Sequence, residues 1–274
     1  MIPPFLLRAL IAVFLISINA ALAGTFTVFR NVSFLVAGAA HAALAGAALA
    51  LVLEELGIHF PVLLGGAVFA VFAAVIAGYA SGRGRLGKED TNTAIAVSFA
   101  LSMSLAVLFI SMIKEYAAKV WGLLIGDLFL LSYSDLKLMA VSTFFVIIIS
   151  ILFYRIFLFI SFDAEGALAC GVNVSLYDYL LLSTIALAVV VIMGGVGAIL
   201  VFAMFVAPSA TASRVVNSVR GVFLTSFLLS LTSGVLGIAI SFYLPFSPGA
   251  IAATIVSSTY FLVAFLRRDA GGRR

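Results

Sequence analysis

Charged residues are scarce in this sequence. Asp, Glu, Lys and Arg make up only 9% of its 274 residues, whereas 65% are hydrophobic. No soluble domain keeps that balance, and the mean hydropathy of +1.31 indicates a helical membrane protein with several spans. The net charge of +4 is no nucleic-acid signal, because most Lys and Arg residues stand at the ends of apolar segments.

Cysteine and nucleotide-binding motifs are also lacking. The single cysteine, Cys170, excludes an internal disulfide and any multi-cysteine metal or redox centre. The sequence contains no GxxxxGK[ST] loop, so energy from ATP would have to come from another subunit. We therefore expect no cofactor bound by this chain and no covalent chemistry on it.

Long apolar runs fill most of the chain, and most of them have the roughly 17–25 residues that a helix needs to cross a bilayer. The nine segments are 4–28, 33–53, 60–79, 93–113, 136–154, 177–193, 196–212, 222–244 and 249–266. The sixth and seventh are short and are separated by Gly194, Gly195 and Gly197, as in broken helices that line pathways. We predict an all-α polytopic membrane protein of eight or nine spanning helices, forming one transmembrane domain over residues 1–274.

The first segment has a second interpretation. Arg8, the apolar run and the tripeptide Ala21-Leu22-Ala23 resemble a cleavable signal peptide. The run continues through Val28, which favours a retained spanning helix.

The basic residues predict the orientation. Eleven of them fall on one side of the membrane if the N-terminus is outside: Arg30, Arg83, Arg85, Lys88, Arg155, Arg214, Arg220, Arg267, Arg268, Arg273 and Arg274. The other side keeps Arg8, Lys114, Lys119 and Lys137. Because cytoplasmic loops are enriched in Lys and Arg, the sequence predicts an outer N-terminus and a cytoplasmic C-terminus in the cytoplasmic membrane, which nine crossings satisfy.

Two stretches are too short to span. Residues Lys114 to Asp135 are too apolar for a free outer loop, and we interpret them as a helix that lies in the membrane interface or dips part-way into the membrane. Residues 161–176 lie on the cytoplasmic side, where Asp163 can cap a short helix and Gly171 can end it. An isolated short helix is marginal in water, so a cytoplasmic partner is expected to dock on it.

His41 is the candidate site residue. It lies about eight residues, or roughly 12 Å, into an uncharged segment made almost wholly of Ala and Gly. An ionisable side chain near mid-membrane indicates function, and neutral imidazole is a good ligand for zinc or manganese. The alternative is a histidine that is hydrogen-bonded to a carbonyl of a neighbouring helix.

Several short motifs together resemble the permease subunits of zinc and manganese ABC importers, the ABC-3 type. They occur in the family's order from about residue 30 to residue 256: Arg30-Asn31-Val32-Ser33-Phe34, Ala39-Ala40-His41-Ala42-Ala43-Leu44-Ala45-Gly46, Ile125-Gly126-Asp127-Leu128, Ser161-Phe162-Asp163-Ala164-Glu165, the segment from Gly197 through Pro208 to Thr211, and Pro248-Gly249-Ala250.

The resemblance implies a type II ABC importer permease that works as a homodimer, with two cytoplasmic ATPase subunits that use ATP and an extracytoplasmic substrate-binding protein. It places the substrate pathway at His41, Ala37, Gly38, Ala45 and Pro208, with His41 as the contact to the transported metal. It places coupling to the ATPase at Asp163, Glu165, Ala167 and Gly171.

The sequence departs from the family pattern at two positions. The family has Asp one helical turn before the histidine, where this chain has Ala37, and Asp at the start of the fourth helix, where it has Asn92. Two ligands four residues apart share a helix face, so Ala37 removes one of the expected pair. A permease for a non-metal or chelated-metal solute is therefore the alternative.

The outer side carries further candidates. Glu54, Glu55 and His59 follow the second segment and could gather cations or meet a delivery protein, although an ordinary solvated loop is the simpler interpretation. Asp127 could contact ions at the outer mouth, but capping a short helix is the expected role. A secondary transporter acting alone would need carboxylates near the centres of its spans, and the nine segments have none there.

Overall fold

The computed structural model describes residues 3–80, 88–113, 124 and 126–271, and nearly all of them are helical. The elements are α1 (Pro4–Asn19), η1 (Ala20–Gly24), α2 (Thr25–Arg30), α3 (Ser33–Glu55), α4 (Val62–Ala80), α5 (Lys88–Ser111), α7 (Tyr133–Leu152), α8 (Tyr154–Phe162), α9 (Ala164–Ala169), α10 (Val174–Val215), α11 (Val219–Ser241) and α12 (Pro248–Gly271). The first three form one continuous helix. Among the described residues, eight helices are long and apolar enough to cross a membrane, which confirms the all-α fold.

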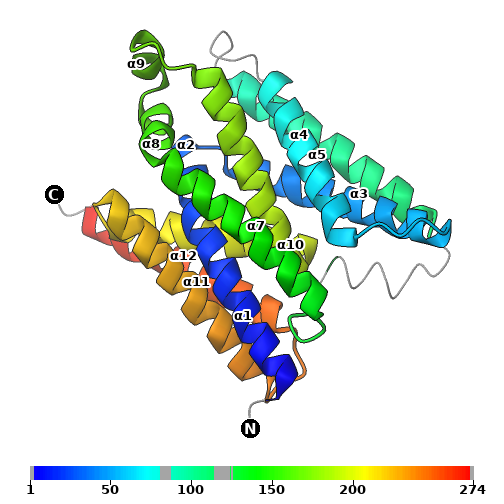
Figure 1. Cartoon of the computed structure of the whole chain (residues 1–274). Coiled ribbons are helices and arrows are strands. Elements are labelled where there is room, and N and C mark those ends of the chain that lie inside the picture. The colour runs from blue at the N-terminus through cyan, green and yellow to red at the C-terminus, as the bar shows by residue number, and fades with distance from the viewer. Residues whose placement is uncertain (1–2, 81–87, 114–123, 125, 272–274) are drawn as a thin grey trace.

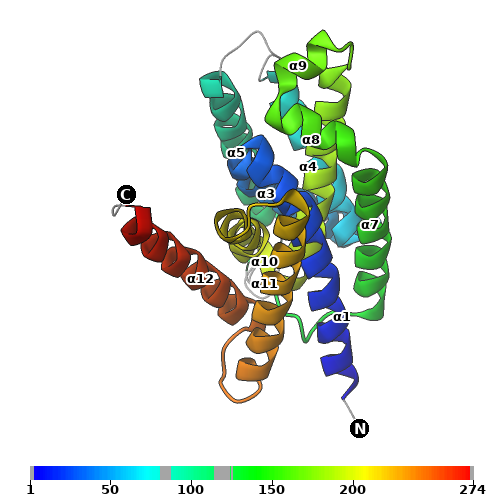
Figure 2. The ribbon, with the colours of Figure 1, turned by 90° about the vertical axis from the view of Figure 1, so that its left-hand side faces the viewer.

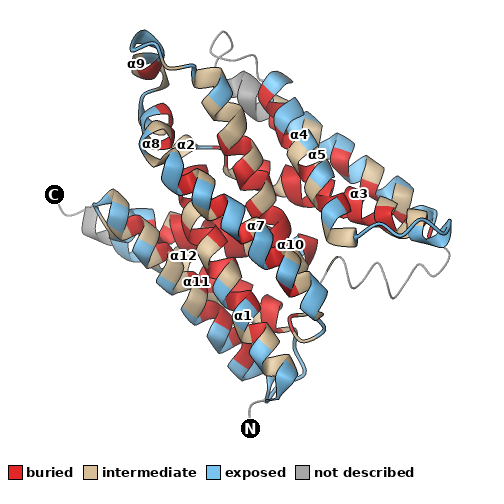
Figure 3. Ribbon diagram, in the orientation of Figure 1, coloured by how far each residue is buried: buried red, intermediate tan, exposed pale blue. Residues whose placement is uncertain are grey.

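Helix α10 stands between two groups of helices (Figures 1 and 2). Helices α3, α4 and α5 pack together on one side of it, and α1, α11 and α12 pack on the other. Helices α7 and α8 lie against α10, α1 and α2 and lead to the short helix α9. Buried residues line the faces turned inward, and the outward faces of α5, α7 and α11 are largely exposed, as lipid contact requires (Figure 3).

The predicted segments 177–193 and 196–212 belong to the single 42-residue helix α10. Gly197 alone interrupts it, with φ 80° and ψ 165°, whereas Gly194 and Gly195 remain helical. A positive φ is readily adopted only by glycine, so this residue allows the helix to bend. Pro208 lies inside the second arm without ending it.

The two ends of α10 lie near the same end of the bundle. Asp178, in its second turn, pairs with Arg30 at the end of α2. Phe223, eight residues beyond the end of α10, contacts the neighbouring Phe29 ring. The part of α10 after Gly197 therefore runs back toward the end of the bundle where α10 begins. Two of the nine predicted segments are thus the two arms of one helix, which gives eight helices in the described residues.

Helix α3 is packed closely because its side chains are small. In its most apolar stretch 78% of the residues are buried. Its closest neighbour is α4, where Gly46 and Gly65 face each other so tightly that a Cβ on either would overlap the other's carbonyl oxygen. The small side chains of this segment thus allow the two helix backbones to come close together.

Two glycines of α3 give a matched stability test. We expect Gly46→Ala to lower the free energy of unfolding by about 1–3 kcal/mol, because the added methyl group meets the α4 backbone, which cannot move aside. Gly38→Ala is the control, since its Cβ would lie 3.8 Å from the nearest atom, in Phe99, an ordinary contact. Thermal unfolding of both purified variants measures the difference, and equal midpoints would contradict the close packing.

Candidate functional site

One face of α3 remains accessible in the half of the helix that the basic residues predict to lie nearer the cytoplasm. We call this face, formed by Phe34, Ala37 and His41, the open stripe. Phe34 is 46% exposed, and Ala37 and His41 are partly exposed, whereas Gly38 and Ala40 between them are buried. The spacings of three and four residues place the three open positions on one helix face. Ala37 and His41 therefore share the face of α3 that is accessible in this stretch.

The His41 ring lies against α5. Its edge meets the ring of Phe99, with centroids 5.0 Å apart and planes at 75°. Its Nδ1 is buried and has no hydrogen-bond partner among the described residues. The alternative interpretation, a bond to a neighbouring carbonyl, thus finds no support at this atom. A buried ring nitrogen without a partner is available to a ligand that approaches from the open stripe.

The other predicted pathway residues are divided between two settings. Ala37 lies one turn from His41 on the open stripe, but Gly38, Ala45 and Pro208 are buried in the packed interior. Within the described part of the chain, no cluster of three or more His, Cys, Asp or Glu side chains could enclose a metal ion. The arrangement is a single imidazole contact rather than a binding cage.

The outer candidates lie at the ends of their helices. Glu54 and Glu55 end α3, and His59 follows, all three exposed. Asp127 stabilises a turn, since its carboxylate accepts from the backbone N–H of Phe129 at 2.8 Å. We expected Asp127 to cap a short helix, but its carboxylate stabilises only this turn, because residues 126–132 are not helical. Of the helix predicted over Lys114 to Asp135, residues 114–123 and 125 lie outside the described residues, and 126–132 are not helical.

The turn that follows Gly126 presses on the bend in α10. Gly126 and Gly197 both have positive φ, 63° and 80°, and a Cβ on Gly126 would overlap the backbone of Gly197. The outer turn and the bend therefore fit only because both residues are glycine. Sequence reasoning noted each glycine separately, but nothing in the spacing of 71 positions indicated that they touch.

Helix α9 forms at the predicted place. The Asp163 carboxylate accepts from the backbone N–H of Gly166 at 2.8 Å, and Gly171 ends the helix with φ 80°. The range predicted for it, 161–176, was too wide, because α8 continues to Phe162 and α10 already begins at Val174. Ala167 is fully buried and anchors the helix, whereas Glu165 is exposed.

The solvent side of α9 is partly apolar. Leu168 is 66% exposed and Phe162, at the end of α8, is 64% exposed. Helix α9, which follows α8, stands at one end of the bundle (Figure 1). Exposed apolar side chains outside the lipid-facing belt mark a surface that another protein can cover.

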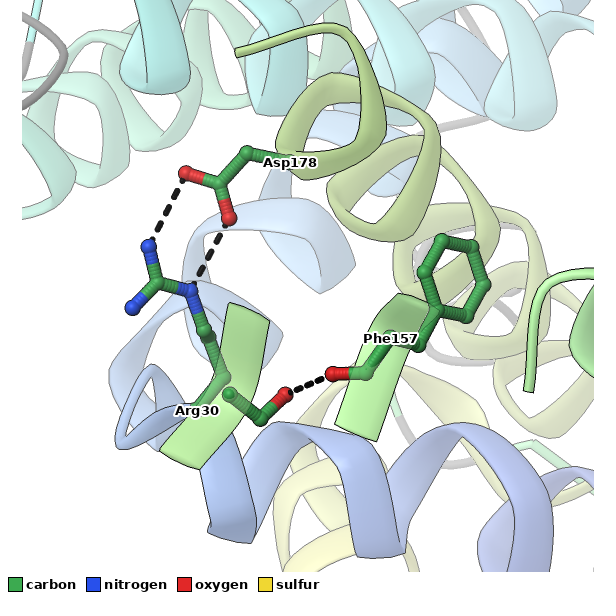
Figure 4. Close-up of polar contacts among 4 residues, drawn as sticks. Arg30, Phe157 and Asp178 are labelled. Carbon is green, nitrogen blue, oxygen red and sulfur yellow. Dashed lines mark hydrogen bonds and ion pairs between the residues drawn. The ribbon is translucent and has the colours of Figure 1, made fainter. Parts of the chain in front are cut away.

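An ion pair behind α9 was missed by sequence reasoning. Arg30 donates to Asp178 from Nε at 2.9 Å and from a terminal nitrogen at 3.2 Å, so that the guanidinium holds both carboxylate oxygens (Figure 4). The pair joins the end of α2, just before α3 begins, to the second turn of α10. The signal was a lone carboxylate near the start of an apolar segment, which requires a partner when it approaches the membrane.

Comparison with known proteins identifies the family. The model of the ABC 3 transport family matches residues 3–268. The chain is 31% identical to the manganese import system permease protein ScaB of Streptococcus parasanguinis, over 95% of this chain and 90% of the relative. It is 29% identical to the chelated iron transport system membrane protein YfeD of Yersinia pestis, over 96% and 85%.

A solved structure agrees in fold. The structure described as PsaBC from Streptococcus pneumoniae in complex with Fab contains a chain that superposes with a TM-score of 0.82 at 27% identity, over 96% of this chain and 91% of that one. The family match extends over nearly the whole chain, and the relatives match along most of their own length. This multi-span membrane protein therefore belongs to the ABC 3 transport family.

Proposed function

We propose that this chain is the permease subunit of an ATP-driven ABC importer that carries a divalent metal ion, manganese or zinc, across the cytoplasmic membrane. The observation that carries the proposal is the His41 Nδ1 atom, which has no hydrogen-bond partner among the described residues, on the open stripe of α3. The manganese import permeases among its relatives support the same substrate class. Manganese and zinc both accept imidazole nitrogen.

The arrangement supports an orientation and a set of partners. The end that carries α9, Arg30 and Arg220 faces the cytoplasm, and the N-terminus lies outside. ATPase subunits dock on the surface formed by Phe162, Glu165 and Leu168. An extracytoplasmic binding protein meets the opposite end, near Glu54 and His59. A second copy of the chain covers the open stripe, so that the two copies supply an imidazole each.

Energy from ATP reaches His41 through the helices. Closure of the ATPases shifts α9, and the Arg30–Asp178 pair transmits the shift from the start of α10 to the connection that begins α3. His41 lies about eight residues, or roughly two turns, along that helix. This chain contributes no bond-making step. It offers the ion a weak contact, which lets the ion leave when the helices tilt.

Transport of a chelated metal is the second candidate. Ala37 leaves His41 without the carboxylate that would strengthen binding of a bare ion. Phe34 and Phe99 flank the stripe and offer apolar rings to an organic chelator. The relative named as a chelated iron transport protein points the same way.

The imidazole can be tested apart from its packing. We expect His41→Ala and His41→Phe to lower uptake of labelled manganese or zinc by about tenfold or more, because neither retains a ligand nitrogen. Phe preserves the ring contact with Phe99, so full recovery of uptake in that variant would show that His41 acts only by packing. Ala37→Asp, one turn away, is expected to raise the affinity for the bare ion.

The docking surface can be tested by association. We expect Glu165→Arg and Leu168→Asp to reduce the amount of ATPase that co-purifies with the permease by about tenfold, the loss of one strong interface contact. Glu54→Arg makes the same charge change at the opposite end of the bundle and serves as the control. Undiminished association in both α9 variants would refute docking there.

The ion pair can be tested by a double-mutant cycle. We expect Arg30→Gln and Asp178→Asn each to lower transport, and the double variant to lose no more than the worse single one. The coupling in stability should be about 1 kcal/mol, as for a partly exposed pair. Additive losses of transport would mean that the two side chains act independently.

A further inference from the structure

A cavity of about 270 Å³ opens between the first helix, α7 and α11, on the side of the bundle away from α3. These three helices face the viewer in Figure 1. Much of its lining is apolar, from Leu22, Phe26 and Phe223. The cavity adjoins two irregular places, the π-helix η1 and the break between α7 and α8 at Phe153. A π-helix within an α-helix often accompanies a functional site.

One polar atom in this cavity lacks a partner. Ser150 lines the cavity and is 2% exposed, and its hydroxyl makes no hydrogen bond to a described residue. Two other buried hydroxyls on these helices bond the carbonyl four residues earlier: Thr143 donates to Met139 and Ser226 donates to Val222, both at 2.7 Å. The Ser150 hydroxyl therefore remains available to a molecule that occupies the cavity.

The lining also carries a positive charge. Arg220, in the first turn of α11, is exposed and lines the cavity, and no carboxylate is among the residues around it. Tyr154 adds a second amphipathic side chain at the wall. A cation beside an apolar hollow at the end of a spanning helix is complementary to a molecule with an anionic head and an apolar tail.

The bilayer is the source of such a molecule. Ile151 at the edge of the cavity is 69% exposed, and Leu224 and Leu228 on the adjoining face of α11 are 61% and 49% exposed. These apolar side chains face lipid, so the cavity opens to acyl chains rather than to water. We propose that it binds one anionic phospholipid, with the phosphate on Arg220, an ester carbonyl accepting from Ser150, and an acyl chain against Leu22 and Phe26.

The bound lipid would support the part of the chain that leads to α9. Its acyl chain fills the hollow beside Phe26, which packs edge-on against Phe157 of α8 with ring centroids 5.5 Å apart. Filling a hollow next to a helix break restores contacts that the break removes. The lipid site shares no residue with the site at His41, so a negative result for lipid binding would leave the transport proposal standing, and the reverse also holds.

Native mass spectrometry of the intact transporter, titrated with phosphatidylglycerol or phosphatidylcholine, tests the proposal. We expect one phosphatidylglycerol to be retained preferentially. Arg220→Gln should weaken it about fivefold, as expected for one Arg near a lipid surface. Ser150→Leu should abolish it by filling the cavity, whereas Ser150→Ala, which leaves the cavity open, should weaken it only mildly.

The controls separate this site from general surface charge. Arg155→Gln removes an exposed charge at the same end of the bundle from a residue outside the cavity lining, and it should leave the retained lipid in place. The double variant Arg220→Gln, Ser150→Leu should lose no more than Ser150→Leu alone. Equal retention of both lipids, or an equal effect of Arg155→Gln and Arg220→Gln, would overturn the proposal. If Ser150→Leu fails to fold, the Arg220 and Arg155 pair decides the outcome alone.

Discussion

The close contact between the backbones of α3 and α4 determines how the rest of the molecule is arranged. Gly46 and Gly65 let the two helices approach until no side chain separates them. Helix α3 then fits between α4, α5 and α10, and nearly all of its surface is covered. Because lipid is as apolar as the helix itself, this fit rather than the hydrophobic effect holds α3 in place. The open stripe at His41 is the part of the α3 surface that these neighbouring helices do not cover.

The bend in α10 connects this packing to the two ends of the molecule. Gly197 turns the helix beside Gly126, the start of α10 pairs with Arg30, and its C-terminal end contacts α12. One element thus touches the Gly126 turn at its middle and the Arg30 pair at its start. A movement imposed on α9 meets a helix that is fixed at the Arg30 pair and has one glycine at which its direction can change. Such an element can pass a shift from one end of the bundle to the other.

Local features of the sequence predicted much of the fold. Hydropathy identified the spans, and the Asp163 cap and the Gly171 ending of α9 follow from side-chain chemistry within a few residues. The features of the fold that the sequence did not predict depend on contacts between residues far apart in the chain. The fusion of two segments into α10 turns on whether Gly194, Gly195 or Gly197 leaves helical geometry, and this is decided by the Gly126 turn. The partner of Arg30 is 148 positions away.

In the candidate site, too, local sequence features were predicted and features that depend on long-range packing were not. Composition singled out His41 as an unusual residue in a small-residue helix, and the helical period placed Ala37 beside it. Only packing shows that these two positions face outward while Gly38 and Ala45 between and beyond them are buried. The unpartnered hydroxyl of Ser150 had no sequence signal, because a serine in an apolar helix usually bonds its own backbone.

A lone imidazole is a sensible contact for a conduit. A cage of several ligands binds a divalent ion so tightly that release becomes slow, and strong binding of one state does nothing to speed passage through a pathway. In the importer proposed above, with Ala37 in place of a carboxylate, each chain would offer one neutral ligand, and an ion at His41 would keep part of its hydration or its chelator. Selection among metals would then fall to the binding protein that delivers them, and the permease would be free to respond to ATP rather than to the identity of the ion.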